Sequence, residues 1–295
     1  MDTPPTYPYA LPATFEQDTI FLEPVTTSGH RLHFYTDTGG GTWIYAAAAA
    51  EVGMSGTAPS GEWATASLPA FDRSAWVPAP AADGLIQLNP SGQLRELLPP
   101  VGRSGMLGQQ WFGGRIWEID YRQQTMVLHR TPPDSTPDAI VPLGFPESEG
   151  RRGSNFPRIE VVVDDEPLDM LLDTGAHTRL TPDATETIGA GTDVATSFII
   201  NSIADRWRAR HPGWRTVSAS EAATGAGMIE VPNIRVGTLD TGPVWFTRRA
   251  DHNFTEYMSQ WMDRTVVGGL GGNALRAFRL VLDYPGAQAT LRAQL

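Results

Sequence analysis

Two aspartates of this chain stand in matching surroundings, 136 positions apart. Asp37-Thr38-Gly39 and Asp173-Thr174-Gly175 repeat one triplet, and each follows a short alternating apolar stretch typical of a buried strand. Carboxylates on two such turns could meet near a pseudo-twofold axis. Two carboxyl groups about 3 Å apart share one proton, because like charges that close cannot both ionise. One would take a proton from water while the other donates to a carbonyl oxygen, giving hydrolysis without a metal or covalent adduct.

The residues around each aspartate suit such a pair. Glycine lacks a Cβ, so the backbone can approach closely and its amides are free to donate to the carboxylates. The threonine hydroxyls can brace the opposite turn. The predicted supporting residues are Thr38, Gly39, Gly40, Thr174, Gly175 and Ala176. Of these, Gly40 has neither a side-chain donor nor a methyl group to place beside Asp37.

A second repeat indicates which elements must position the two turns. At an offset of 163, Leu107-Gly108 aligns with Leu270-Gly271, and Asp120-Tyr121 aligns with Asp283-Tyr284. Matching landmarks in both halves predict a duplicated architecture. The segment 131–153 is rich in Pro and Gly and is interpreted as a linker. We therefore predict an N-terminal lobe over residues 1–130 and a C-terminal lobe over residues 154–295.

The offset grows by 27 residues between the two repeats, so the second half contains an insertion. The predicted insertion runs from Ser197 to Arg210, where Ile199, Ile203 and Trp207 recur at helical spacing among charged residues. We expect an amphipathic surface helix there and a short helix over the alanine run 46–50. Elsewhere, short apolar stretches between Gly and Pro predict a mainly β fold.

Longer motifs carry a family resemblance. Residues 34–40 read Phe-Tyr-Thr-Asp-Thr-Gly-Gly and residues 170–176 read Met-Leu-Leu-Asp-Thr-Gly-Ala; Met106-Leu107-Gly108 and Gly269-Leu270-Gly271 follow downstream. These motifs resemble the retropepsin-like and pepsin-like aspartic peptidases, in a bacterial-type form with both lobes in one chain. Gly40 departs from the fourth position of both groups.

The resemblance implies two pseudo-symmetric closed β lobes and hydrolysis of peptide bonds by Asp37 and Asp173. It also implies inhibition by pepstatin-type compounds and a polypeptide substrate bound in extended form between the lobes. The later Leu-Gly strand of each half would thread behind the aspartate loop and support it. Because one chain supplies both turns, we expect the active species to be a monomer.

Composition narrows the remaining chemistry. The net charge of -11 argues against a nucleic acid partner. The absence of cysteine excludes disulfides, thiolate metal sites and a cysteine nucleophile. His30, His33 and His177 lie near the two turns but lack metal-site spacing, so we expect no metal and no cofactor. No apolar run reaches membrane-spanning length and the start lacks a signal peptide; we expect a cytoplasmic chain as written, periplasmic or secreted if a leader was removed.

Three features have more than one interpretation. A third triplet, Asp240-Thr241-Gly242, precedes Pro243 and is interpreted as a hairpin turn. The residues Thr224, Gly225, Ala226 and Gly227 could belong to a hairpin over the cleft that contacts substrate, or to a plain loop. The aromatic residues Trp63, Phe71 and Trp76 could line a pocket, but large aromatics are more often core residues.

Two other functions fit parts of the sequence. The same two-lobed scaffold could be a catalytically silent module that binds a peptide or protein, because a fold does not guarantee activity. Gly40 motivates that alternative, and the presence of both aspartates argues against it. A carbohydrate-binding β protein could use the nine Trp and seven Tyr for stacking, but it leaves the duplicated turns unexplained.

Overall fold

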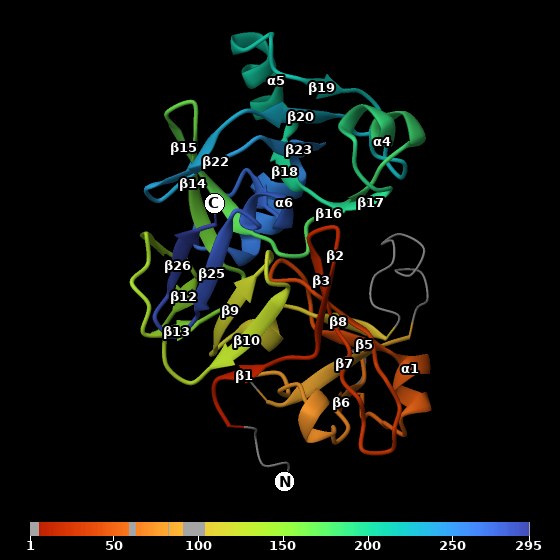
Figure 1. Ribbon diagram of the computed structural model, residues 1–295. Helices are drawn as coiled ribbons and strands as arrows, with labels where there is room; N and C mark the ends of the chain where they lie inside the picture. Colours follow the sequence, from red (N-terminus) through yellow and green to blue (C-terminus); the bar gives the residue numbers. More distant parts are fainter. Residues whose placement is uncertain (1–5, 59–62, 82, 91–103, 295) are drawn as a thin grey trace.

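The chain is mainly β and forms two lobes that share one sheet (Figure 1). The computed structural model describes residues 6–58, 63–81, 83–90 and 104–294. The first half of the chain, red to yellow in Figure 1, builds one lobe, and the second half, green to blue, builds the other. Among the described residues, no helix combines the length and apolar character needed to cross a membrane.

The first lobe contains a seven-stranded sheet in the order β2-β3-β4-β8-β5-β7-β6. Its strands are β2 (Ala13–Glu16), β3 (Thr19–Leu22), β4 (Phe34–Thr36), β5 (Trp43–Tyr45), β6 (Thr65–Ser67), β7 (Leu85–Asn89) and β8 (Gly105–Leu107). Among the described residues of this lobe, the helical segments are α1 (Ala46–Glu51), η1 (Arg73–Ala75) and α3 (Gln109–Phe112). The helix expected over the alanine run is therefore confirmed as α1.

The second lobe contains a nine-stranded sheet in the order β19-β20-β23-β18-β24-β15-β14-β21-β22. Its strands are β14 (Arg158–Val163), β15 (Glu166–Leu172), β18 (Ser197–Ile200), β19 (Thr216–Val217), β20 (Met228–Val231), β21 (Ile234–Val236), β22 (Leu239–Thr241), β23 (Val244–Arg249) and β24 (Gly268–Leu270). A separate pair is β16 (His177–Arg179) with β17 (Asp193–Ala195). The helical segments are α4 (Pro182–Ile188), α5 (Asn201–Arg210), η2 (Asn253–Met258), η3 (Ser259–Trp261) and α6 (Gly272–Leu275).

The two lobes and the segment between them contribute to the shared sheet, whose order is β1-β10-β9-β25-β26-β11. The strands are β1 (Tyr9–Ala10), β9 (Ile116–Asp120), β10 (Thr125–His129), β11 (Ala139–Pro142), β25 (Phe278–Asp283) and β26 (Gln288–Ala293). The central pair, β9 with β25, joins the two repeats antiparallel. The segment interpreted as a linker is more ordered than expected, because it supplies β11 and the short pair β12 (Glu147–Ser148) with β13 (Arg151–Arg152).

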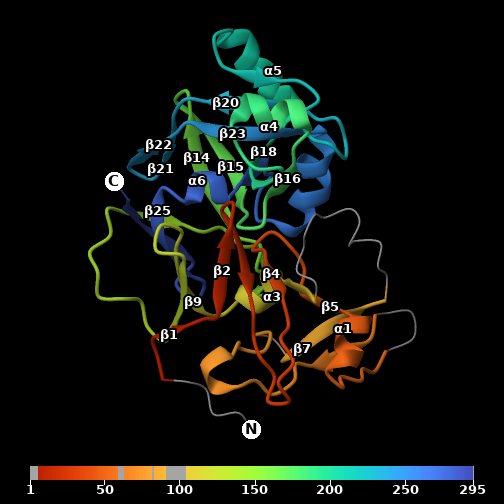
Figure 2. The same ribbon diagram turned by 45° about the vertical axis from the view of Figure 1, so that its right-hand side comes forward.

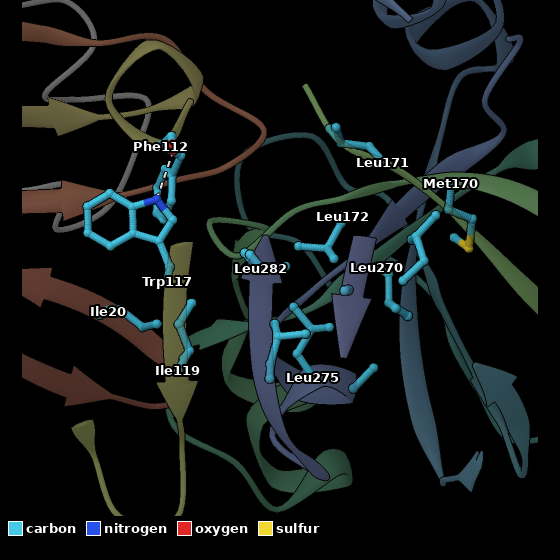
Figure 3. Packing of buried hydrophobic residues seen from close by; sticks show 14 of the residues in the cluster. Ile20, Phe112, Trp117, Ile119, Met170, Leu171, Leu172, Leu270, Leu275 and Leu282 are labelled. Atoms are coloured by element: carbon cyan, nitrogen blue, oxygen red, sulfur yellow. Dashed lines mark hydrogen bonds between the residues drawn. The ribbon is translucent and has the colours of Figure 1, made fainter. Parts of the chain in front are cut away.

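One hydrophobic cluster runs through both lobes and the shared sheet. Trp117 on β9 is fully buried, and its indole Nε1 donates to the carbonyl of Phe112 at 2.8 Å (Figure 3). Leu172, which ends β15, is paired with Leu270 of β24 and is likewise buried. Burying each such leucine contributes about 1.5–3 kcal/mol, so the strands that lead to the aspartate turns are anchored in the core.

The two lobes repeat one strand arrangement around the turns. β4 pairs in parallel with β8, and β8 pairs antiparallel with β5; β15, β24 and β18 repeat these pairings in the second lobe. Thr42 before β5 and Ser197 in β18 match as well, because each hydroxyl accepts from a glycine amide at 3.0 Å, that of Gly108 or Gly271. Hence β5 corresponds to β18, and α1 corresponds to α5.

This correspondence corrects the predicted place of the insertion. The expected amphipathic helix is present as α5, which buries Ile203 and Trp207, but it starts at Asn201 because Ser197–Ile200 forms β18. The offset is already 155 between Thr42 and Ser197, so most of the extra residues lie earlier, in β16, α4 and β17.

Local signals explain why the extra segment folds as it does. Thr181 caps α4 through a hydroxyl that accepts from the amide of Ala184 at 3.4 Å, and Pro182 takes the first helical position. Gly189 ends the helix in the left-handed conformation, with φ of 72°, which a residue with a side chain rarely adopts.

A hairpin from the first lobe makes a further contact with the second lobe. The β2–β3 hairpin, red in Figure 2, points toward β16 and α6. At its tip the carbonyl of Gln17 accepts from the amide of Ala195 at 3.0 Å, and Asp18 forms an ion pair of 2.8 Å with Arg276. The aspartate turns therefore lie between two connections that fix the lobes relative to each other.

Candidate active site

Strand pairing places both aspartates at the same point of each lobe. The amide of Asp37, directly after β4, donates to the carbonyl of Leu107 at 3.1 Å. The amide of Asp173, directly after β15, donates to the carbonyl of Leu270 at 2.9 Å. Both side chains are largely buried, with 9% exposure for Asp37 and 8% for Asp173. The Leu-Gly strand of each half thus supports its aspartate turn.

The two turns meet so closely that only glycine fits at the third position. A Cβ on Gly175 would lie 2.2 Å from Cγ of Asp37, and a Cβ on Gly39 would lie 2.7 Å from Cγ of Asp173. The amide of Gly39 donates to Oδ1 of Asp37 at 2.7 Å, and that of Gly175 donates to Oδ1 of Asp173 at 3.2 Å. Each glycine therefore donates its amide to the aspartate of its own turn. Because it has no side chain, it also lets the aspartate of the other turn approach closely.

The threonines link the turns across the boundary between the lobes. The amide of Thr38 donates to Oγ1 of Thr174 at 3.1 Å, and the amide of Thr174 donates to Oγ1 of Thr38 at 3.0 Å. Oγ1 of Thr38 also donates to the carbonyl of Leu172 at 2.6 Å. Both threonines are fully buried, so these bonds are shielded from water.

The electrostatics of the pair are unequal. Burial raises the pKa of Asp37, although a hydrogen bond with Asp173 and the amides of Gly39, Gly40 and Gly175 act in the opposite direction. Burial, the charge of Asp37 and the hydrogen bond between the two carboxyl groups raise the pKa of Asp173 well above its usual range. Both carboxyl groups thus have raised pKa values, as expected for two carboxyl groups that lie close together in a buried site.

The residue after each Asp-Thr-Gly triplet differs, Gly40 in the first lobe and Ala176 in the second, because different side chains fill the space beside it. A Cβ on Gly40 would lie 2.5 Å from Oδ2 of Asp37 and 2.5 Å from Sδ of Met106. In the second lobe the matching residues are Ala176 and Gly269, so the methyl group is present and the long side chain is missing. A side chain at position 40 would therefore meet both Asp37 and Met106, so Gly40 is not a vacant position beside Asp37.

Sequence reasoning missed a further contact between the turns. The hydroxyl of Tyr35, buried two residues before Asp37, donates to the carbonyl of Gly175 at 2.8 Å. The matching residue of the second lobe is Leu171, so this bond has no symmetric counterpart. The repeat could have drawn attention to Tyr35 as a polar side chain where its counterpart is apolar, but the acceptor lies 140 residues away.

The other sequence candidates lie apart from this pair. Asp240 was expected in a hairpin turn but lies on strand β22 of the β21–β22 hairpin. It is exposed, and its carboxylate accepts from Asn233 and from Arg235. Phe71 is a core residue, Trp76 packs against Tyr9, and Trp63 is 42% exposed.

Thr224, Gly225, Ala226 and Gly227, interpreted either as a hairpin over the cleft or as a plain loop, lie between β19 and β20. The four residues belong to the loop that joins these two strands. Among the residues that the structure describes, no three His, Asp or Glu side chains are grouped so as to hold a metal ion.

A solved structure has the same architecture. The crystal structure of the aspartic proteinase from Irpex lacteus matches this chain with a TM-score of 0.52, covering 97% of each chain at 11% sequence identity. The chain has the pepsin-like fold. No family model matches the sequence, and no curated protein matches it either. Identity this low establishes the pepsin-like fold alone, so function must be argued from the paired aspartates.

Proposed function

We propose that this chain is an aspartic endopeptidase in which Asp37 and Asp173 act as a catalytic pair. The observation that carries the proposal is the close approach of two buried aspartate turns, one from each lobe: a Cβ on Gly175 would lie 2.2 Å from Cγ of Asp37, and a Cβ on Gly39 would lie 2.7 Å from Cγ of Asp173. Burying two carboxyl groups in contact is costly for stability, and such perturbed pairs are concentrated at functional sites.

The shorter amide hydrogen bond at Asp37, 2.7 Å from Gly39 against 3.2 Å from Gly175 to Asp173, supports the following roles. Asp37 is the proposed base that takes a proton from water. Hydrogen bonds from the amides of Gly39, Gly40 and Gly175 favour its ionised form. Asp173 is the proposed acid that donates its proton to the carbonyl oxygen of the scissile bond. The water oxygen bonds to the carbonyl carbon and gives a tetrahedral intermediate. This collapses when Asp37 passes its proton to the amide nitrogen, a hydroxyl of the intermediate returns a proton to Asp173, and the C–N bond breaks. The pair then again holds one proton.

The experiment is hydrolysis of an unfolded protein by matched variants. Asp37→Asn and Asp173→Asn should each abolish turnover, because neither carboxyl group can replace the other. Asp240→Asn is the control, since it removes an aspartate from the same triplet at an exposed site. The expected result is loss of at least about 1,000-fold for the first two variants and unchanged rate for the third.

Folding must be checked alongside the rates. If Asp37→Asn and Asp173→Asn bound peptides but the wild type never cleaved one, the chain would be a silent binding module instead. Near wild-type turnover in either variant would contradict the shared-proton mechanism.

We also propose that the substrate is a polypeptide bound in extended form between the lobes, and that the active species is a monomer. Both aspartate turns belong to one chain, and the shared sheet is completed within it. Sedimentation combined with activity measurements tests this. Activity confined to a dimer fraction and lost on dilution would contradict it.

A further inference from the structure

A cavity of about 550 Å³ lies beside the β19–β20 hairpin in the second lobe. α5, the loop with Thr224 and Gly227, and the end of β23 form its walls. It is lined by three arginines, Arg208, Arg248 and Arg249, and no described Asp or Glu lines it. That composition is unusual here, because the chain as a whole has 33 acidic against 22 basic residues.

The helix α5 directs one of these arginines to the cavity. Asn201, Ala204 and Arg208 follow one another at spacings of three and four residues, so they share one helical face, and all three line the cavity. The other arginines of α5 point elsewhere: Arg206 pairs with Glu166, and Arg210 pairs with Asp164 at 2.8 Å. Among the described residues, no carboxylate forms an ion pair with Arg208.

The two remaining arginines, Arg248 and Arg249, form hydrogen bonds that join the elements around the cavity. Arg248 donates to Asp205 at 2.8 Å and to Asn201 at 3.0 Å, which ties β23 to α5. Arg249 donates to both carboxylate oxygens of Glu221, at 2.7 and 2.9 Å.

Glu221 anchors the loop at the rim of the cavity. Its carboxylate accepts from Thr178 at 3.0 Å and from the hydroxyl of Thr224 in the same loop. Because Glu221 is buried, these contacts fix the loop from Glu221 to Gly227 to the segment that follows Asp173. The rim of the cavity is therefore preformed.

A single side chain connects the cavity with the aspartate pair. The guanidinium carbon of Arg249 lies 4.3 Å from the ring centroid of Phe198. Phe198 is paired with Gly269, where a Cβ would lie 3.6 Å from the phenyl ring and 3.3 Å from Oδ2 of Asp173. An extended peptide advances about 3.3 Å per residue, so a substrate at Asp173 reaches the cavity within a few residues.

We propose that this cavity is a specificity pocket that binds a carboxylate of the polypeptide substrate, with Arg208 as its charged partner. The proposal rests on the proposed peptidase function and adds the chemical class of a preferred substrate residue. Arg248 and Arg249 are already neutralised by protein carboxylates, so they shape the pocket, whereas Arg208 supplies the unpaired charge. The carboxylate can come from a Glu or Asp side chain or from the free C-terminus of a peptide.

The test uses short peptide pools with one fixed position, occupied by Glu in one pool and by Gln in the other. The fixed position is moved along the peptide, and each pool is prepared with a free and with an amidated C-terminus. Wild type should prefer Glu at one fixed position by about tenfold in kcat/KM, less at high salt. Arg208→Gln should lower that ratio to near one. Arg210→Gln, on the opposite side of α5, is the matched control and should keep the preference.

A binding measurement separates this proposal from the proposed function. Fluorescence anisotropy of the same pools with Asp37→Asn should show the tenfold preference in Kd, and Arg208→Gln in that background should remove it. If wild type cleaves no pool, the peptidase assignment fails while binding still tests the pocket. Equal treatment of Glu and Gln at every position, or equal effects of Arg208→Gln and Arg210→Gln, would overturn the pocket. A preference seen only with free C-termini would assign the pocket to the peptide end.

Discussion

Thr38 and Thr174 join the two lobes by reciprocal hydrogen bonds, because the backbone amide of each donates to the hydroxyl of the other. Neither lobe can form this arrangement alone. The paired turns thus depend on both lobes being folded, and the hydroxyl groups are more important than the bulk of these side chains.

Thr38→Val should therefore be more harmful than Thr38→Ser. Valine keeps the shape of threonine but leaves the amide of Thr174 and the carbonyl of Leu172 without their buried partner. An unpaired buried group costs about 1–3 kcal/mol, so the free energy of unfolding should fall by roughly that amount. Denaturant unfolding measures it. Equal stability of the Val and Ser variants would show that the hydroxyl bonds contribute nothing.

Asp173→Asn should stabilise the protein at neutral pH. The folded state raises the pKa of Asp173 well above its usual range, so the folded chain keeps a proton that the unfolded chain has released. Wild-type stability from this group is complete below about pH 4 and declines as pH rises toward the folded pKa, by about 1.4 kcal/mol for each pH unit between the unfolded and folded pKa. The variant lacks this decline. Unfolding curves at pH 3 and pH 7 should show similar stabilities at pH 3 and a more stable variant at pH 7.

Gly40→Ala should be better tolerated when Met106 is shortened. The new methyl group would lie 2.5 Å from the Met106 sulfur, so the single variant should lose about 1–3 kcal/mol of stability and much of the hydrolytic rate. Gly40→Ala with Met106→Gly copies the pair Ala176 and Gly269 of the second lobe and should recover part of both losses. Ala176→Gly is the control and should have a small effect. If Met106→Gly did not rescue Gly40→Ala, Met106 would not be what excludes a side chain at position 40.

The sequence predicted the features that depend on local chemistry. The two aspartate turns and the Leu-Gly strands each arise within a few residues, so the repeats identified them directly. Residues 197–200 were predicted as helix and form β18, because a short apolar run fits either periodicity and only pairing with β23 and β24 decides it.

Contacts between distant segments could not be predicted in the same way. Tyr35 and Gly175 are far apart in sequence, and so are Phe198 and Arg249, which connect Asp173 to the arginine-lined cavity. Position 40 has no room for a side chain because Met106 and Asp37 lie beside it, and only the folded chain brings Met106 there. The turn residues were therefore visible in the repeats, whereas the residues that tune them depend on tertiary packing.

Arg249→Met should destabilise the second lobe by about 3–5 kcal/mol, because it leaves Glu221 buried without its cation. Burial opposes ionisation of Glu221, but the hydrogen bonds and charge of Arg249 outweigh it and lower the pKa. The stability from this pair is present at neutral pH and is lost as pH falls below the usual range of glutamate. Glu221→Gln with Arg249→Met should cost less than the sum of the single changes, which a double-mutant cycle measures. Additive costs would argue against direct coupling.

His177→Gln should make the protein more resistant to acid. Burial lowers the pKa of His177 to about 4; the nearby Asp193 and Glu221 oppose this shift, and Arg179 adds to it. Between the usual histidine pKa of about 6.5 and the folded value, the unfolded chain binds a proton that the folded chain does not, so wild type loses stability as pH falls. The loss amounts to roughly 3 kcal/mol by pH 4, and glutamine cannot take up that proton. Thermal unfolding from pH 7 to pH 4 should show a smaller decline for His177→Gln than for wild type, whereas parallel declines would mean that His177 is protonated in the folded protein.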